Sequence, residues 1–378
     1  MSLRRLAFVL WNGNLGGAER LTMELCLAIQ RLGLAEASVV FVEQGHWLAT
    51  QLDCVGIDHS QLGLPRGRSA LRCCRRLVRE LSLRGPDGSV LVHGGYLAAA
   101  ARLGGYREAL LNVEHGSILL WNERRPAKRF VDRVSLTVGA RALDGTIAVS
   151  DFVLEEVRRH PHPRVVERVH NGVDLKRFKP DPRGDELSDR FVIGMAGRLI
   201  PGKGTVEMVR ALRPTIEGVR AHLLIAGDGP LHAHLEQLVV ERGLSASVSF
   251  AGVVADMESF WSQCDIAVHV TNGLRESFGL VVAEAMACGL PAIVSSEGAL
   301  GEVVENGVTG TLVPAGDIEA LWSALSDYAR DPSLRQRHGV AARARCEAMF
   351  DVAHTARRYV SLLDTAQSRR RGRVGDAR

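Results

Sequence analysis

The 378-residue chain lacks the features that mark disulfide-rich, zinc-binding, membrane-spanning or nucleic-acid-binding proteins. Its seven cysteines include no CxxC pair, which favours a reducing cytoplasm over a disulfide framework or a zinc site. The first apolar run, residues 6–11, is too short for a signal-peptide core or a membrane span. No DxD, HExxH, Walker or nucleic-acid motif stands out. A net charge of +4 is too small to imply a nucleic-acid partner.

The chain does contain a regular alternation of strand-like and helix-like segments, with 46% hydrophobic residues and 24% charged ones. Strands are expected at 5–11, 37–42, 89–93, 110–114, 145–149, 165–169, 191–196, 221–226, 247–250, 265–270, 292–296 and 311–313. Helices are expected at 18–32, 69–83, 151–159, 203–217, 230–242, 255–263, 279–288, 300–305 and 317–330. This alternation predicts an α/β fold of two parallel sheets, each covered by helices on both faces.

A polar segment with two prolines, residues 175–190, interrupts the alternation and is the expected linker. It separates an N-terminal domain, residues 1–174, from a C-terminal domain, residues 191–350. Two doubly wound domains of this kind are expected to face each other across a central cleft, where such sheets bind ligands. The basic tail, residues 367–378, is expected to be disordered.

The segment 275–291, RESFGLVVAEAMACGLP, places two carboxylates around a turn that opens a helix. The spacing of Glu276 and Glu284 does not put both on one face of a continuous helix. Glu276 is therefore expected in the loop, Ser277 at the N-cap and Glu284 about one turn into the helix. Backbone N–H groups at a helix start bind phosphate, and carboxylates accept hydrogen bonds from hydroxyls. The layout predicts a ligand that carries both phosphates and hydroxyls.

Two further glycine-rich turns follow expected strands. Residues 14–20, NLGGAER, open a helix, where glycines let the backbone approach a phosphate. Residues 194–204, GMAGRLIPGKG, place Arg198 and Lys203 at the mouth of a strand, which suits a diphosphate. A structural turn and a pair of solvated surface charges are the plainer alternatives.

Two histidines also follow expected strands. His115 lies in LNVEHGS and His93 in VHGGY, and His93 is the weaker candidate for a functional role. A histidine in this position is more often a structural residue of the core. Residues 170–174, HNGVD, contain strong turn chemistry and have mainly a structural interpretation.

Together these segments resemble family 4 of the retaining glycosyltransferases, whose signature has two glutamates separated by seven residues. The resemblance covers nearly the full chain and is more specific in the second half. It implies the GT-B architecture, two Rossmann-like domains facing a cleft, with a final helix that crosses back to the first domain, here residues 351–366. It also implies a metal-independent hexosyltransferase or similar enzyme, without a cofactor. Such an enzyme moves a sugar from a nucleotide diphosphate donor to an acceptor hydroxyl with retention of configuration. UDP is the expected nucleotide, from its prevalence in the family.

The resemblance also assigns roles to individual residues. In the family, an Arg and a Lys neutralise the leaving diphosphate, the first glutamate lies beside the donor sugar, and the second holds the ribose. A histidine lies against the donor sugar and the acceptor. The implied catalytic residues are His115, Arg198, Lys203 and Glu276. The implied donor-binding residues are Gly16, Gly17, Val253, Ser277, Phe278, Gly279, Leu280 and Glu284, and no metal ligand is implied.

Two other classes share this architecture. A sugar-nucleotide 2-epimerase would need the same diphosphate site, but the segment 275–291 argues against it. A non-catalytic partner subunit would be expected to lose some of the four residues Arg198, Lys203, Glu276 and Glu284. The acceptor, a small molecule or a glycan, cannot be read from the sequence. An Arg-rich amphipathic stretch, residues 66–84, could dock on anionic membranes. A packed helix with a basic outer face is the favoured interpretation of that stretch.

Overall fold

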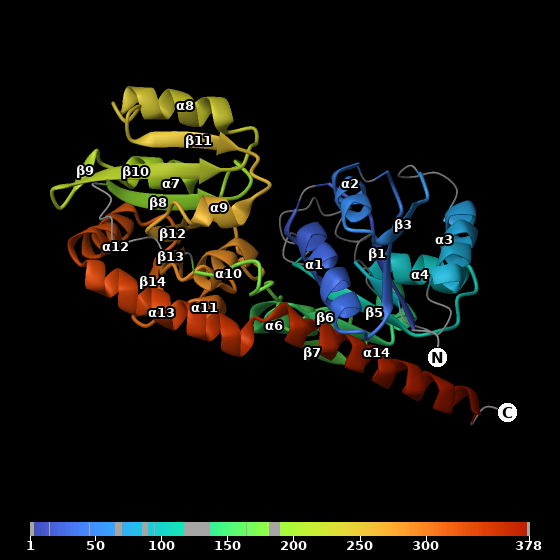
Figure 1. The fold of residues 1–378 in the computed structure, drawn as a ribbon. Helices are drawn as coiled ribbons and strands as arrows, with labels where there is room; N and C mark the ends of the chain where they lie inside the picture. Colours follow the sequence, from blue (N-terminus) through green and yellow to red (C-terminus); the bar gives the residue numbers. More distant parts are fainter. Residues whose placement is uncertain are drawn as a thin grey trace. The chain divides into compact units, whose positions relative to one another are not determined.

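The computed structural model describes residues 4–14, 16–44, 46–64, 70–84, 90–93, 95–116, 137–163, 165–180 and 190–375. The chain divides into two compact units. Unit 1 comprises Met1–Gly172 with Val352–Arg378, and unit 2 comprises Val173–Asp351. Figure 1 shows that each unit is built on one sheet with helices packed around it.

The sheet of unit 1 has the strand order β3-β2-β1-β4-β5-β6-β7, and all of its pairs are parallel. Its strands are β1 (Arg5–Leu10), β2 (Glu36–Phe41), β3 (Asp58–Gln61), β4 (Val90–Val92), β5 (Leu110–Glu114), β6 (Gly145–Ala148) and β7 (Val166–Arg168). Its helices are α1 (Gly17–Arg31), α2 (His46–Cys54), α3 (Ala70–Arg84), α4 (Gly95–Leu103), α6 (Asp151–Arg158) and α14 (Val352–Gly375).

The sheet of unit 2 has the order β11-β10-β8-β12-β13-β14, with β9 antiparallel to β10. Its strands are β8 (Arg190–Ala196), β9 (Thr215–Ile216), β10 (Val219–Ala226), β11 (Val248–Gly252), β12 (Ile266–His269), β13 (Ala292–Ser295) and β14 (Gly310–Val313). Its helices are α7 (Thr205–Ala211), α8 (His232–Glu241), α9 (Met257–Trp261), α10 (Leu280–Ala287), α11 (Leu300–Val303), α12 (Ile318–Arg330) and α13 (Pro332–Met349).

Burial explains why the central segments form strands. In β1, β5, β6 and β12 nearly every residue is buried, as expected for parallel strands covered on both faces. Helix starts follow ordinary capping chemistry: the side chains of Ser150, Asp256, Asp317 and Asp331 each accept a hydrogen bond from a backbone N–H of the helix they precede. The two units therefore have separate cores made by the same physical means.

The structure differs from the sequence expectations in several places. The helix expected at 203–217 ends at Ala211, and Pro214 is followed by the short strand β9. Strand β3 was not expected, because its sequence DHSQ is polar and its side chains are only partly buried at the sheet edge. Helix α13 was not expected either. Most of the expected linker, residues 181–189, lies outside the described residues.

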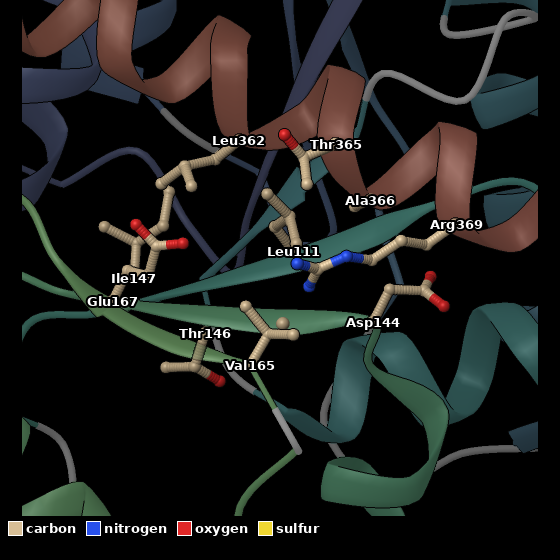
Figure 2. A pocket seen from close by; sticks show the side chains of 11 residues that line it. Leu111, Asp144, Thr146, Ile147, Val165, Glu167, Leu362, Thr365, Ala366 and Arg369 are labelled. Atoms are coloured by element: carbon tan, nitrogen blue, oxygen red, sulfur yellow. The ribbon is translucent and has the colours of Figure 1, made fainter.

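The C-terminal helix also extends beyond its expected end. The sequence suggested a helix at 351–366 and a disordered tail from residue 367, but α14 continues to Gly375. Within unit 1, α14 packs against α1 and β5. Figure 2 shows Leu362, Thr365, Ala366 and Arg369 of α14 above the strand residues of a small pocket, with the Arg369 side chain extending across the pocket over Leu111.

Polar contacts reinforce this packing of α14 on unit 1. The Gln367 side chain accepts a hydrogen bond from the Ala109 N–H at 3.0 Å, and Arg370 forms an ion pair with Asp144 at 2.8 Å. Both residues lie in the segment that was expected to be disordered, so these contacts give a reason for its helical order. Among the described residues, no helix is long and apolar enough to cross a membrane.

A pair of buried tyrosines tests how hydroxyl burial affects stability. Tyr359 of α14 is fully buried, and its hydroxyl has no hydrogen-bond partner among the described residues. Tyr328 of α12 is equally buried, but its hydroxyl bonds to His338 at 2.9 Å and accepts from Thr311 at 3.3 Å. We expect Tyr359→Phe to be neutral or stabilising, and Tyr328→Phe to cost about 1 kcal/mol or more. Urea unfolding measures both. An equal loss of unfolding free energy in the two variants would contradict the difference in hydrogen bonding between the two hydroxyls.

Candidate active site

The candidate site of unit 2 lies at the carboxyl ends of two neighbouring strands, β8 and β12. The loop after β8 carries Arg198 and Lys203, and the loop after β12 carries Glu276. Parallel strands place their carboxyl ends at the same edge of a sheet, where open α/β sheets bind ligands. The two loops that the sequence singled out separately therefore meet in the fold.

Two glycines allow these loops to approach closely. Gly202 and Gly204 flank Lys203 and have positive φ angles of 86° and 68°. A Cβ on Gly204 would lie 2.1 Å from the carbonyl oxygen of Val270, and one on Gly202 would lie 2.9 Å from the Cβ of Leu274. The loop after β8 is thus pressed against the loop after β12 with no room for side chains at these positions. This contact brings Lys203 to Glu276.

Glu276 is bound on one carboxylate oxygen by two donors. Its Oε2 lies 2.5 Å from Nζ of Lys203 and 3.1 Å from Nε2 of His269, which ends β12. Its backbone is fixed as well, since its carbonyl accepts a hydrogen bond from the N–H of Ala299 at 2.9 Å. Burial by itself would raise the pKa of Glu276, but the hydrogen bond from His269 and the charge of Lys203 hold that pKa well below its usual range. The carboxylate is therefore ionised and well positioned.

The helix that follows begins later than the sequence suggested. Ser277 was the expected N-cap, but α10 starts at Leu280, with Gly279 as its N-cap at φ 93°. Gly279 is needed for two reasons. A side chain would be strained at this φ, and its Cβ would lie 2.6 Å from Cδ2 of Leu300. Val282 and Ala283 already donate their N–H groups to the Gly279 carbonyl, so the N–H groups that precede them at the start of α10 are the ones suited to an anion.

The other residues of this segment divide between the core and the site. The Phe278 ring is buried and packs edge-on against Phe350, with ring centroids 5.5 Å apart, so only its backbone could serve a ligand. Glu284 lies within α10 and is 2% exposed. Such deep burial of a carboxylate is unusual on a helix, so a polar partner is expected for it.

Arg198 is exposed at the start of its loop and lines one small hollow together with Lys203 and His269. Val253 follows β11 and is 60% exposed. The hollow thus collects two cations and a histidine at the edge formed by β8 and β12.

The candidate residues of unit 1 lie at the carboxyl ends of β1, β4 and β5, which are neighbours in its sheet. Gly16 is the N-cap of α1 and Gly17 its first residue, with open space around a Cβ built on Gly17. His93 follows β4 and His115 follows β5, with ring centroids 4.8 Å apart and planes tilted by 30°. Nε2 of His115 and both ring nitrogens of His93 are buried without a hydrogen-bond partner among the described residues.

Burial keeps this histidine pair neutral. It lowers the pKa of His115 to about 4, and it lowers the pKa of His93, which the neighbouring His115 lowers further. Neutral imidazoles with unbonded nitrogens can donate to or accept from hydroxyls, but they offer no positive charge to a phosphate at neutral pH. The pair therefore suits a polar, uncharged part of a ligand.

Comparison with known proteins places the chain in a family. Two family models match in succession, Glycosyltransferase Family 4 over residues 15–177 and Glycosyl transferases group 1 over residues 178–345. A D-inositol 3-phosphate glycosyltransferase of Streptomyces scabiei is 30% identical over 310 residues, 75% of this chain and 69% of that protein. The chain belongs to glycosyltransferase family 4.

Other similarities are consistent with this assignment. A GDP-mannose-dependent α-(1-6)-phosphatidylinositol monomannoside mannosyltransferase of Mycolicibacterium smegmatis is 33% identical over 193 residues, 47% of this chain; the chain spans only 50% of that relative's length. The crystal structure of Anabaena HepE in complex with UDP and glucose has a TM-score of 0.81 at 22% identity, covering 96% of this chain and 99% of HepE. The fold is therefore GT-B.

The structure adds one residue that sequence reasoning missed. His269 was part of an apolar strand pattern and carried no motif of its own. Only the register of β12 beside β8 places it at the site edge, where its ring reaches Glu276. A polar residue at the end of a buried strand was the available signal.

The close approach of the two loops predicts a specific cost for filling it. Gly204 and Gly243 have nearly the same φ, 68° and 67°, but a Cβ on Gly243 meets nothing within 4 Å. Gly243→Ala is expected to cost about 1 kcal/mol for its backbone conformation alone. Gly204→Ala should cost about 2 kcal/mol more, because the loop must also move off Val270. Urea unfolding compares them, and similar losses would show that the loops are not tightly packed.

The neutral histidines of unit 1 predict acid sensitivity. The folded pKa of His115, about 4, lies below the ordinary value of 6.5, so the unfolded chain takes up a proton first as pH falls. The stability that this burial contributes is complete above about pH 6.5 and is lost as pH falls toward 4. Between pH 7.5 and 5 we expect a loss of about 1–2 kcal/mol from His115.

Replacing both His93 and His115 with Gln should remove this part of the pH dependence. Urea unfolding at pH 7.5 and pH 5 measures the difference for the variant and for the wild type. An unchanged pH dependence in the double variant would mean that the two rings titrate normally.

Proposed function

We propose that the protein is a retaining, metal-independent glycosyltransferase that uses a nucleotide diphosphate sugar. The observation that carries this proposal is the ionised Glu276 bound by Lys203 and His269 beside the start of α10. The arrangement places cations, the N-terminal N–H groups of a helix and a fixed acceptor at one edge of the sheet. A donor with a diphosphate and a sugar needs these three features together.

Each group has a proposed task. Arg198, Lys203 and the backbone N–H groups of Ser277–Leu280 bind the diphosphate and stabilise its charge as it leaves. Glu276 holds the donor sugar by its hydroxyls, and Glu284 holds the ribose. In unit 1, neutral His115 contacts the sugar near its 6-hydroxyl, and the backbone at Gly16 and Gly17 approaches the donor phosphate and the acceptor.

Retention would then follow a front-face route. The leaving phosphate oxygen takes the proton of the acceptor hydroxyl while the sugar passes through an oxocarbenium-like state on the same face. We propose this route because no carboxylate is assigned to covalent attack of the kind that retaining glycosidases use. The charge of the diphosphate would be met by the protein cations without a metal ion, so EDTA should leave activity unchanged.

The donor nucleotide is proposed to be UDP. Support comes from the structural likeness to HepE, which was crystallised with UDP and glucose. The mycobacterial relative is described as GDP-mannose-dependent, so GDP is the competing nucleotide. Val253, exposed beyond β11, is the proposed backbone contact at the nucleobase end.

The acceptor is proposed to be a soluble small molecule or glycan, and the protein is expected to act in the cytoplasm. The S. scabiei relative is named for D-inositol 3-phosphate and the mycobacterial one for a phosphatidylinositol mannoside, so both soluble and lipid acceptors occur among relatives. In α3, Leu77 and Leu81 are buried, and among the described side chains of this helix, residues 75–84, Leu83 is the one exposed apolar residue, at 57%. Peripheral membrane contact is therefore not favoured, and nucleic acid is not a proposed partner. Co-sedimentation with anionic but not neutral vesicles would reverse the preference for a soluble acceptor.

The two alternatives from the sequence are not favoured. An epimerase would convert the nucleotide sugar without an acceptor, and the family match is to glycosyltransferases. A non-catalytic subunit would have no reason to keep Arg198, Lys203, Glu276 and Glu284, all of which are present. Sugar transfer to an acceptor, as opposed to an epimerised donor or no reaction, separates the three.

The proposal is tested by separating binding from turnover. Thermal shift with UDP, GDP, TDP and ADP identifies the nucleotide, and donor hydrolysis or transfer measures turnover. Arg198→Ala and Lys203→Ala should each lower turnover by about tenfold or more, ~1.4 kcal/mol of transition-state stabilisation. Glu284→Ala should weaken binding of the free nucleotide, while Glu276→Ala should mainly lower turnover.

Calorimetry with the free nucleotide checks this difference between the two glutamates. Equal losses of affinity in the two variants, or no nucleotide binding by the wild type, would overturn the proposal. Wild-type turnover in Arg198→Ala or Lys203→Ala would remove the role assigned to that residue.

A further inference from the structure

We propose that His269 is a positioning residue. It keeps the Glu276 carboxylate oriented and ionised when the Lys203 ammonium turns to bind the diphosphate. The inference rests on the proposed function, because it assigns Glu276 to the sugar and Lys203 to the phosphate. It adds a residue that the sequence did not single out and gives that residue a separate task from the two that it touches.

The geometry shows two donors that share one acceptor atom. Lys203 and His269 both contact Oε2 of Glu276, at 2.5 Å and 3.1 Å. Neither contact uses Oε1. An ionised carboxylate can accept on both oxygens, so Oε1 can accept from a sugar hydroxyl while Oε2 stays bound. The protein thus holds Oε2 of the carboxylate, and Oε1 is left to accept a hydrogen bond from a ligand.

The two donors differ in how firmly they are placed. His269 ends β12, is 4% exposed and has a short side chain with two rotatable bonds. Lys203 lies in the loop before α7, and its ammonium sits on a flexible four-carbon stem. Both line the same hollow as Arg198, where the diphosphate is proposed to bind. A diphosphate that arrives there competes for Lys203 far more than for His269.

If the Lys203 ammonium moved to the phosphate, Glu276 would need a second donor to stay ionised. Burial acts to raise the pKa of Glu276, and His269 and Lys203 are the described groups that counter it most. If Lys203 turned to the phosphate and His269 were absent, the carboxyl group would tend to take up a proton and rotate. His269 removes this conflict, because the same site can then serve the diphosphate and the sugar at once.

The tautomer of His269 fits this task. Oε2 of an ionised carboxylate only accepts, so Nε2 carries the hydrogen. Nδ1 is buried without a hydrogen-bond partner among the described residues, and a hydrogen on Nδ1 would be a buried donor without an acceptor. The ring therefore presents a fixed Nε2–H to Glu276.

Conservative variants of His269 test the inference by activity. His269→Gln keeps an amide N–H near the position of Nε2, whereas His269→Leu and the shorter His269→Asn cannot reach Glu276. We expect Leu and Asn to lower kcat by about tenfold or more, with affinity for the free nucleotide within about threefold of wild type. Gln should recover most of the loss. His222→Leu is the matched control, because His222 lies in the same sheet and its hydrogen bonds go to Ser249, at 3.0 Å, and to the backbone of Ala246. This control should keep wild-type kcat.

A titration that needs no activity separates this inference from the proposed function. Carboxyl carbons of labelled Glu are followed by NMR against pH, with Glu276→Gln to assign the signal. In His269→Leu and His269→Asn the pKa of Glu276 should rise by about one unit or more, and in His222→Leu it should not move. Unchanged titration in both His269 variants, or a Gln variant as impaired as Leu, overturns the role of His269. A wild type without transfer activity would overturn the proposed function, and the titration would still decide whether His269 holds Glu276.

Discussion

The contact on which the rest of unit 2 depends is the shared bond of Lys203 and His269 to one oxygen of Glu276. Each of the three residues comes from a different segment. The Glu276 side chain is only 17% exposed, and a charge so largely removed from water is tolerated when it is paired and hydrogen-bonded. The glycines on either side of Lys203, the register of β12 beside β8 and the anchoring of the Glu276 carbonyl by Ala299 all serve this contact. Each of these features helps to keep the Glu276 carboxylate within reach of Lys203 and His269.

The candidate groups at the carboxyl ends of the strands are charged in unit 2 and neutral in unit 1. Unit 2 collects fixed charges: Arg198 and Lys203 line one hollow, and Lys203 is paired with the ionised Glu276. Unit 1 places two histidines whose pKa values are lowered by burial, so they are uncharged at neutral pH. A phosphate is met by the first kind of group and a hydroxyl by the second.

The sequence predicted the alternating strands and helices well because parallel strands buried on both faces read as short apolar runs. It did not predict β3, because a strand at the sheet edge can be polar and partly exposed. It also did not predict the helical order of residues 367–375, which depends on contacts with Ala109 and Asp144. It also placed the N-cap of α10 at Ser277, because local propensity favours a serine, whereas packing against Leu300 places Gly279 there. Tertiary contacts decided each of these cases.

The candidate site shows the same limit at the level of single residues. Motifs pointed to Lys203 and Glu276, since each lies in a glycine-rich turn after a strand, but they could not show that the two side chains meet. His269 had no local signal, because its role exists only through a partner seven positions along the chain and a neighbouring strand from another part of the sequence. The consequence is chemical. A carboxylate bound on a single oxygen by two donors can serve its ligand only as an acceptor, so what it binds must donate, as a sugar hydroxyl does and a phosphate at neutral pH does not.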